Sequence, residues 1–305
     1  MSAVPSAADA GRGAVYDRGY RPYEGPRGLR GSATFALYKA SMRRALGLRR
    51  SWRQKVAPFV LLGIVTVPAI VNVGIGYITR DQPAFDRIEI ITYREYVGVS
   101  AALLLFVGLV APDVMCPDRR QRVLPLMFAR PLLGVDYVIA KVGAIATILL
   151  AFSFLPQMVL FLGNMMVSKD GALDYFTGHL DVLWKVPVAV ALLAVYYAVI
   201  GCAISSLTDR RIVAGAAVIG LFLLTSISSG VVVGDWEIEG GSYGALINVL
   251  GMPLYLRDLV FLGHISTDSP LNGVAGGGLL AVACYSVVVL AGSVTLWWRY
   301  RWVER

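Results

Sequence analysis

Six long apolar segments constrain the fold of this chain more than any other feature. They cover residues 56–79, 96–114, 138–167, 182–207, 212–234 and 274–298. A helix needs about 20 mostly apolar residues to cross about 30 Å of hydrocarbon, where each backbone amide must find its partner within the helix. With 57% hydrophobic and 16% charged residues, the chain is predicted to be an all-α integral membrane protein with six transmembrane helices.

Two parts of the chain do not fit a plain crossing. The third segment is longer than a crossing needs and contains Pro156, so we expect a tilt, a kink or an extension beyond the membrane. Residues 235–272 are half apolar but interrupted by Gly251 and Pro253 and by the charged pair Arg257 and Asp258. They predict either short re-entrant helices before the last crossing or an amphipathic helix on the outer surface.

The distribution of cations predicts the orientation. The first 55 residues hold twelve Lys and Arg, and further arginines follow the second, fourth and sixth apolar segments. Cations near the ends of crossings stay in the cytoplasm, so we expect both termini on the cytoplasmic side of the plasma (inner) membrane. The net charge of +8 is then explained by contact with anionic membrane lipid, and nucleic acid is not needed as a partner.

The N-terminal region divides into two parts. Residues 1–32 are rich in Gly, Pro, Ser and Ala and predict a flexible cytoplasmic extension. From 33 to 55, helical spacing separates an apolar set from a basic set, which predicts an amphipathic helix on the inner membrane surface. The alternative is a basic segment that only anchors the first crossing. The residues of this interfacial helix are Phe35, Tyr38, Met42, Arg43, Arg44 and Trp52.

A basic loop joins the second and third segments of the six-helix domain, residues 56–305. Its sequence from 118 to 141 is DRRQRVLPLMFARPLLGVDYVIAK, too polar to cross a bilayer. Cations suit an acidic partner surface and the leucines and phenylalanine suit an apolar groove, so the loop is predicted to dock on a cytoplasmic partner. The docking residues are Asp118, Arg119, Arg120, Arg122, Leu124, Leu126, Phe128 and Pro131.

This loop resembles the coupling region of permease subunits of ABC-2 type transporters. The pattern is an acidic residue with arginine, leucines, a proline and a lysine that opens the next crossing, here Asp118 and Arg119, then Leu124 and Leu126, then Pro131, then Lys141. The resemblance implies a coupling helix that docks on two separate ATP-binding subunits, and a dimer with an identical or homologous second permease. The chain departs from the pattern at Asp118, where Glu is usual, and at Arg122 and Val123, where Gly and Thr are frequent.

The chain has no phosphate-binding loop of the form GxxxxGK[ST]. We therefore expect no catalytic residues and no cofactor in this chain, with ATP and Mg bound by the partner subunits. The three cysteines show no CxxC spacing and predict no metal site.

A candidate substrate path comes from hydroxyls in the apolar segments, at Ser100, Thr225, Ser226, Ser228 and Ser229. Hydroxyls in crossings also pack helices together or bond their own backbone, so this reading stays open. With few buried charges, an amphipathic, lipid-like or drug-like cargo is favoured, and the resemblance implies export. The alternatives are a scaffold that does not transport and a lipid-modifying transferase, which would need clustered acidic residues.

Overall fold

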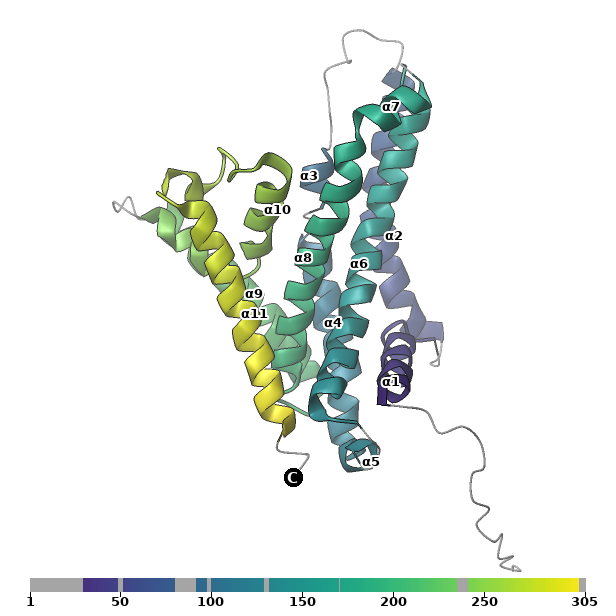
Figure 1. Ribbon diagram of the computed structural model, residues 1–305, viewed down its shortest axis with the longest axis vertical. Coiled ribbons are helices and arrows are strands. Elements are labelled where there is room, and N and C mark those ends of the chain that lie inside the picture. The colour runs from purple at the N-terminus through teal and green to yellow at the C-terminus, as the bar shows by residue number, and fades with distance from the viewer. Residues whose placement is uncertain are drawn as a thin grey trace, which may run out of the picture.

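The structure, a computed structural model, describes residues 30–48, 52–79, 92–97, 100–128, 132–169, 171–234 and 241–301. Every regular element in these ranges is helical (Figure 1). The elements are α1 (Arg30–Ala45), α2 (Trp52–Thr79), α3 (Tyr93–Tyr96), α4 (Ser100–Arg120), α5 (Leu124–Phe128), α6 (Gly134–Val167), α7 (Ala172–Gly178), α8 (Leu180–Ser205), α9 (Arg211–Gly234), the 3₁₀ turns η3 (Gly241–Ile247) and η4 (Pro270–Gly273), α10 (Met252–Leu262) and α11 (Gly277–Arg301).

Five of these helices are long and apolar enough to cross a membrane. They are α2 from Phe59, α6, α8, α9 and α11. The expected all-α membrane fold with multiple crossings is therefore confirmed. The expected second crossing corresponds to α4, which is outside this set and carries Asp113, Asp118, Arg119 and Arg120 near its C-terminus, so a sixth crossing stays a prediction.

The central helix of the bundle is α8. It packs against α4, α6, α9, α10 and α11, and the rings of Tyr196 and Tyr197 in its middle are fully buried. Small residues bring α4 and α9 into close contact, since a Cβ added at Gly215 would lie 2.7 Å from the carbonyl oxygen of Gly108. Close approach through glycine is a common way to pack helices in a membrane, where lipid provides no hydrophobic drive for association.

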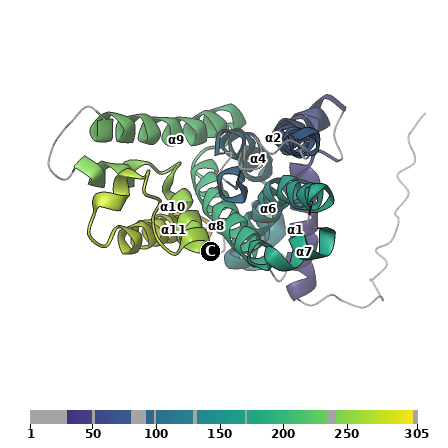
Figure 2. The same cartoon turned by 90° about the horizontal axis from the view of Figure 1, so that it is seen from above.

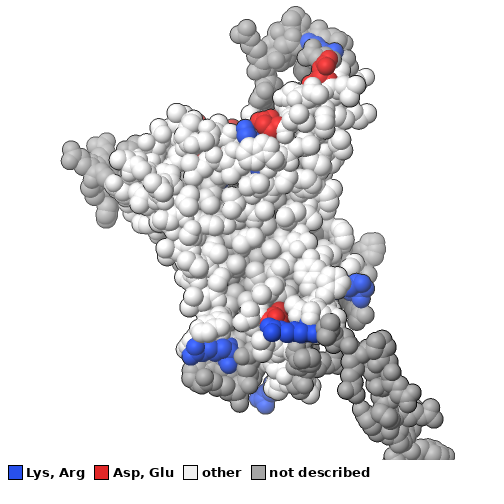
Figure 3. All heavy atoms as spheres, viewed as in Figure 1, with Lys and Arg blue, Asp and Glu red and all other residues white. Residues whose placement is uncertain are grey.

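Charged side chains lie toward the two ends of the molecule. On the face shown in Figure 3, Lys and Arg gather at the lower end and a broad band without charge separates them from the opposite end. The lower end contains α1, α5 and the C-terminal end of α11 (Figure 1), and we call it the basic end. An uncharged band between charged ends is what a membrane-embedded surface requires.

The N-terminal helix is shorter than predicted. We expected one amphipathic helix from 33 to 55, but α1 ends at Ala45 and Trp52 is the first residue of α2. The reason is Gly47, whose φ of 66° is left-handed. Its N–H bonds to the carbonyl of Arg44 and the N–H of Leu48 bonds to that of Arg43, which is a Schellman motif that ends a helix. Residues 1–29 of the predicted extension lie outside the described residues, and Arg30 already begins α1.

The third apolar segment extends well beyond a membrane thickness, as expected. Helix α6 has 34 residues and contains Pro156, and at about 1.5 Å per residue it is roughly 50 Å long. Figure 1 shows α6, with α2 and α8 beside it, rising past α9 and α11 to α7, at the end opposite α5.

The region before the last helix folds into short elements. From residue 241 it forms η3, α10 and η4, and α10 packs against α8 and α11. Two tyrosines of α8 hold it, because the hydroxyl of Tyr196 donates to the carbonyl of Val249 at 3.0 Å and that of Tyr197 to the carbonyl of Leu250 at 2.8 Å. In the view from above, α10 lies beside α8 and α11 (Figure 2).

Candidate docking site at the basic end

The predicted docking loop begins inside a helix. The resemblance implies a coupling helix in this loop, and in the structure α4 continues to Arg120 and a separate short helix, α5, covers Leu124–Phe128. Between them, the N–H of Arg122 bonds to the carbonyl of Arg119, and the N–H of Val123 bonds to that of Asp118. This is a second Schellman ending, and it places Arg122 at a left-handed φ of 53°. Glycine adopts that conformation without strain.

Asp118 is the centre of a buried ion cluster. Its side chain is fully buried, and it contacts Arg44 of α1 and Lys141 of α6, whose Nζ lies 2.5 Å from Oδ2. The hydroxyl of Tyr137 donates to the same oxygen at 3.0 Å. Lys141 also donates to the carbonyl of Val114 at 3.0 Å.

The charge of Asp118 is balanced by its neighbours. Burial alone raises the pKa of a carboxyl, but the Lys141 and Arg44 cations and their hydrogen bonds outweigh burial and hold the pKa of Asp118 below its ordinary value. The carboxylate is therefore ionised at neutral pH. Three helices, α1, α4 and α6, meet at this one charge, and α11 joins them because the ring of Tyr300 packs on Tyr137 with centroids 4.8 Å apart.

This burial corrects one part of the predicted docking set. Asp118 is fully buried and Leu124 is 8% exposed, so neither side chain offers a surface to a partner in this structure. The reason is that an ionised aspartate at a helix end is stabilised by buried cations, and Lys141 lies on the adjacent helix. Asp118 therefore acts on the loop by positioning it.

Arg119 is also engaged within the chain. Its guanidinium bonds to the carbonyl of Ser206 and lies 3.2 Å from the carboxylate of Asp209, both in the turn between α8 and α9. A second ion pair, between Asp113 of α4 and Arg211, joins the same two regions. The turn at 205–211 is thus held to the C-terminal part of α4 by two ion pairs.

The remaining docking residues face outward. Arg120 and Arg122 are exposed, and Leu126 of α5 is 73% exposed. Phe128 is half-buried and its ring packs edge-on to Tyr137 at 6.0 Å. Pro131 lies outside the described residues. Of the predicted docking residues, Arg120, Arg122 and Leu126 are therefore the exposed ones, at the end of α4, in the turn that follows it and on α5.

Some of the residues predicted for the interfacial helix are exposed, and others contact the helix bundle. Phe35 is 64% exposed and stacks on Tyr38 at 6.0 Å, whose hydroxyl donates to Thr147 of α6 at 2.9 Å. Met42 packs against the core, Arg43 is exposed and Arg44 reaches Asp118. Trp52 belongs to α2, and its side chain is outside the described residues.

One ion pair between α1 and α6 was not expected from the sequence. Arg30 forms a forked contact with Asp136 of α6, at 2.6 and 2.9 Å. The Asp136 carboxylate also accepts a hydrogen bond from the N–H of Leu133 at 3.1 Å, at the start of α6. The sequence signal for a role of Asp136 was its place in the first turn of an apolar helix, because an acidic side chain there stabilises the helix N-terminus.

The hydroxyls of the candidate substrate path do not share one environment. Thr225 donates to the carbonyls of Leu221 and Phe222 on its own helix, at 2.9 and 3.1 Å. Ser229 is 5% exposed, Ser226 is half-buried and Ser228 is exposed. The side chain of Ser100 lies outside the described residues. Thr225 thus agrees with the alternative interpretation, in which hydroxyls hydrogen-bond to the backbone of their own helix instead of lining a substrate path.

No known family model and no curated protein sequence matches this chain.

Proposed function

We propose that this chain is the permease subunit of an ATP-driven transporter of the ABC-2 type. The observation that carries the proposal is the construction of the turn between α4 and α5. It presents Arg120, Arg122 and Leu126 outward, while the Asp118 cluster behind it joins α1, α4 and α6. A partner that pulls on this turn acts on three helices at once, because buried ion pairs resist separation.

The charge of this turn also suits an ATP-binding partner. Two exposed arginines and a leucine match a groove with an acidic rim and an apolar floor. Nucleotide-driven closure of two such partners would move the turns of two permease subunits, so the working assembly is two permease subunits with two ATP-binding subunits, which hold ATP and Mg. The second permease subunit is identical or homologous.

The orientation follows from the same surface. We place the basic end in the cytoplasm, with both chain termini there, because cations are retained on that side of the plasma (inner) membrane. Helix α4 then makes the sixth crossing, and α10 dips into the outer half of the bundle as a re-entrant element. The cargo is amphipathic, lipid-like or drug-like, and it is exported.

The test reverses the charge of the exposed arginines only. We expect Arg120→Glu/Arg122→Glu to fold normally but to lose most of its co-purification with a co-expressed ATP-binding subunit that wild type binds, together with cargo-stimulated ATPase activity. Arg119 is left intact because it binds the turn at 206–209. The control, Lys169→Glu, reverses a charge at the opposite end and should behave as wild type, and Lys185 is left intact because it pairs with Asp181 at 2.9 Å.

Two results would refute the proposal. One is wild-type association and ATPase stimulation in the arginine variant. The other is failure of the wild-type chain to bind any ATP-binding subunit in the nucleotide-free, ATP-bound or ADP-bound state. Association without stimulation by cargo would favour the scaffold function.

A further inference from the structure

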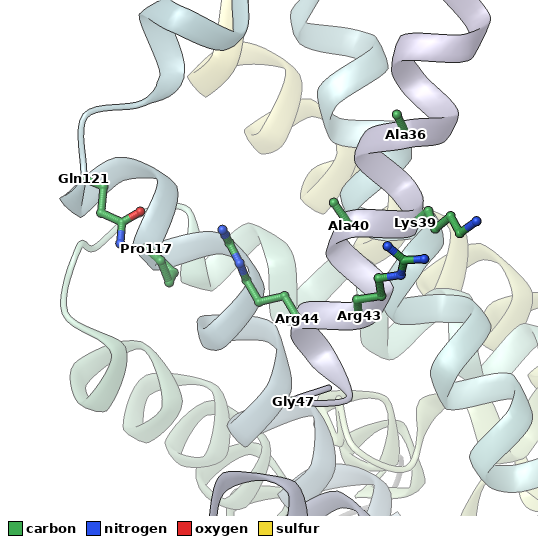
Figure 4. A pocket seen from close by; sticks show the side chains of 8 residues that line it. All are labelled: Ala36, Lys39, Ala40, Arg43, Arg44, Gly47, Pro117 and Gln121. Carbon is green, nitrogen blue, oxygen red and sulfur yellow. The ribbon is translucent and has the colours of Figure 1, made fainter. Parts of the chain in front are cut away.

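A basic groove lies between α1 and the end of α4. Its volume is about 550 Å³, within the roughly 300–1,000 Å³ typical of small-molecule sites. Three cations of α1 line it, Lys39, Arg43 and Arg44, and Gln121 lies across from them. Among the described residues that line the groove, none is acidic. Figure 4 shows Arg44 reaching from α1 toward Pro117, whereas Lys39 and Arg43 project from the other side of α1.

Two of these three cations are available to bind an anionic ligand. Arg44 is balanced by Asp118. Lys39 and Arg43 are exposed, and within the described part of the chain neither pairs with a carboxylate. Ala36 and Ala40, whose side chains are small, also line the groove.

An apolar cleft adjoins the other side of α1. Its volume is about 240 Å³ and its lining surface is apolar. Met42 and Leu46 of α1 form one wall, Phe59 of α2 and Ile148 of α6 form others. Residues three positions apart are neighbours on a helix surface, so Met42 of the cleft lies next to Lys39 of the groove, and Leu46 lies next to Arg43.

We propose that the groove and the cleft together bind one anionic phospholipid. Its phosphate contacts Lys39 and Arg43, and one acyl chain lies in the cleft against Met42 and Leu46. A soluble phosphate ion would satisfy the cations but leave the cleft unexplained. Helix α1 runs across the bundle rather than along it (Figures 1 and 2), which is the position of a helix at the headgroup level of a bilayer.

The bound lipid would link α1 to the docking turn. Gln121 follows Arg120 directly and lines the same groove, so a headgroup held there touches both the interfacial helix and the start of the turn. The binding itself does not depend on the transport function proposed above, and its test uses no ATP-binding partner.

The experiment titrates phosphatidylglycerol into the delipidated full chain in neutral detergent and counts bound lipid by mass spectrometry of the intact protein. We expect Lys39→Gln/Arg43→Gln to weaken phosphatidylglycerol binding about 30-fold, from about fivefold for each cation near an anionic lipid. The matched control is Arg120→Gln/Arg122→Gln, which removes the same charge from exposed positions outside the groove and should bind as wild type.

Two further arms separate the lipid from other occupants. Ala151 lines the cleft and is exposed, so Ala151→Phe should fill the cleft without disturbing the core and should weaken phosphatidylglycerol binding severalfold. Inorganic phosphate at millimolar concentration should not displace the lipid. Thermal melting of each variant confirms that it is folded.

Several outcomes would overturn the proposal. Equal weakening in both arginine-containing variants would mean a general attraction to the basic end. Binding of phosphatidylcholine as tight as phosphatidylglycerol would remove the role of the cations. Displacement by inorganic phosphate, with no effect of Ala151→Phe, would mean a plain anion site.

Discussion

Replacing Asp118 by Asn should destabilise the folded chain through Lys141. The lysine side chain is 2% exposed and the aspartate 0%, so replacing the carboxylate by an amide leaves a buried ammonium group with neutral partners such as the carbonyl of Val114 and no contacting negative charge. Breaking a buried pair in this way costs about 3–5 kcal/mol. Arg44 adds little to this cost, because its side chain is 33% exposed and can turn to water.

The measurement is the free energy of unfolding, followed by tryptophan fluorescence during titration with sodium dodecyl sulfate in mixed micelles. The double variant Asp118→Asn/Lys141→Met removes both charges and should recover about 2–3 kcal/mol of the loss, the upper part of the roughly 0.5–3 kcal/mol range of coupling energies between residues in contact. A single variant that costs less than about 1 kcal/mol, or a double variant no more stable than the single, would refute the role of the ion pair.

The same pair predicts a dependence on pH. The pKa of Asp118 is lower in the folded chain than its ordinary value of 3.8, so its contribution to stability is fully present above that value and is lost as the pH falls through the lowered one. The difference in unfolding free energy between wild type and Asp118→Asn should stay constant from neutral pH to about 4 and shrink in more acidic solution. A difference that already declines between pH 7 and 5 would contradict this.

Two further predictions concern backbone positions. Gly215→Ala should destabilise the fold by about 1–3 kcal/mol, because the added Cβ would meet the Gly108 carbonyl oxygen at 2.7 Å and push α4 and α9 apart. Gly220→Ala on the same helix, which meets nothing within 4 Å, should be neutral or slightly stabilising, and equal effects would contradict the close contact. Arg122→Gly should stabilise by about 1 kcal/mol, since it removes a side chain from a left-handed residue, whereas Arg120→Gly in the helical last turn of α4 should destabilise by up to about 1 kcal/mol. A loss of stability in Arg122→Gly would show that its conformation is not strained.

Several helix boundaries could be predicted closely from the sequence. The segment expected at 212–234 is α9, Arg211–Gly234, and the one at 182–207 is α8, Leu180–Ser205. A membrane helix satisfies its backbone within itself, so a long apolar segment is enough to specify it. The end of α1 was also within reach, because Gly47 followed by a leucine is a signal for a Schellman ending.

Other features depended on which helices became neighbours. The sequence marked Asp118 as part of a docking surface, but Arg44 and Lys141, at separations of 74 and 23 residues, draw it into the interior. Helix α8 has a composition similar to that of α9, yet α8 is central and α9 is largely exposed. Neither outcome is visible in a linear pattern, because similar apolar residues serve equally to face lipid or another helix.

The sequence by itself thus determined the class of protein, the long helices and the basic character of one end. These depend on local hydrogen bonding and on the cost of moving charge into hydrocarbon, which each segment carries independently. The tertiary structure decided which charges are buried in pairs and which stay exposed at the basic end. Ion pairs such as Asp118 with Lys141 form only when two helices place their side chains within a few ångströms, and that distance is set by the packing of the whole bundle.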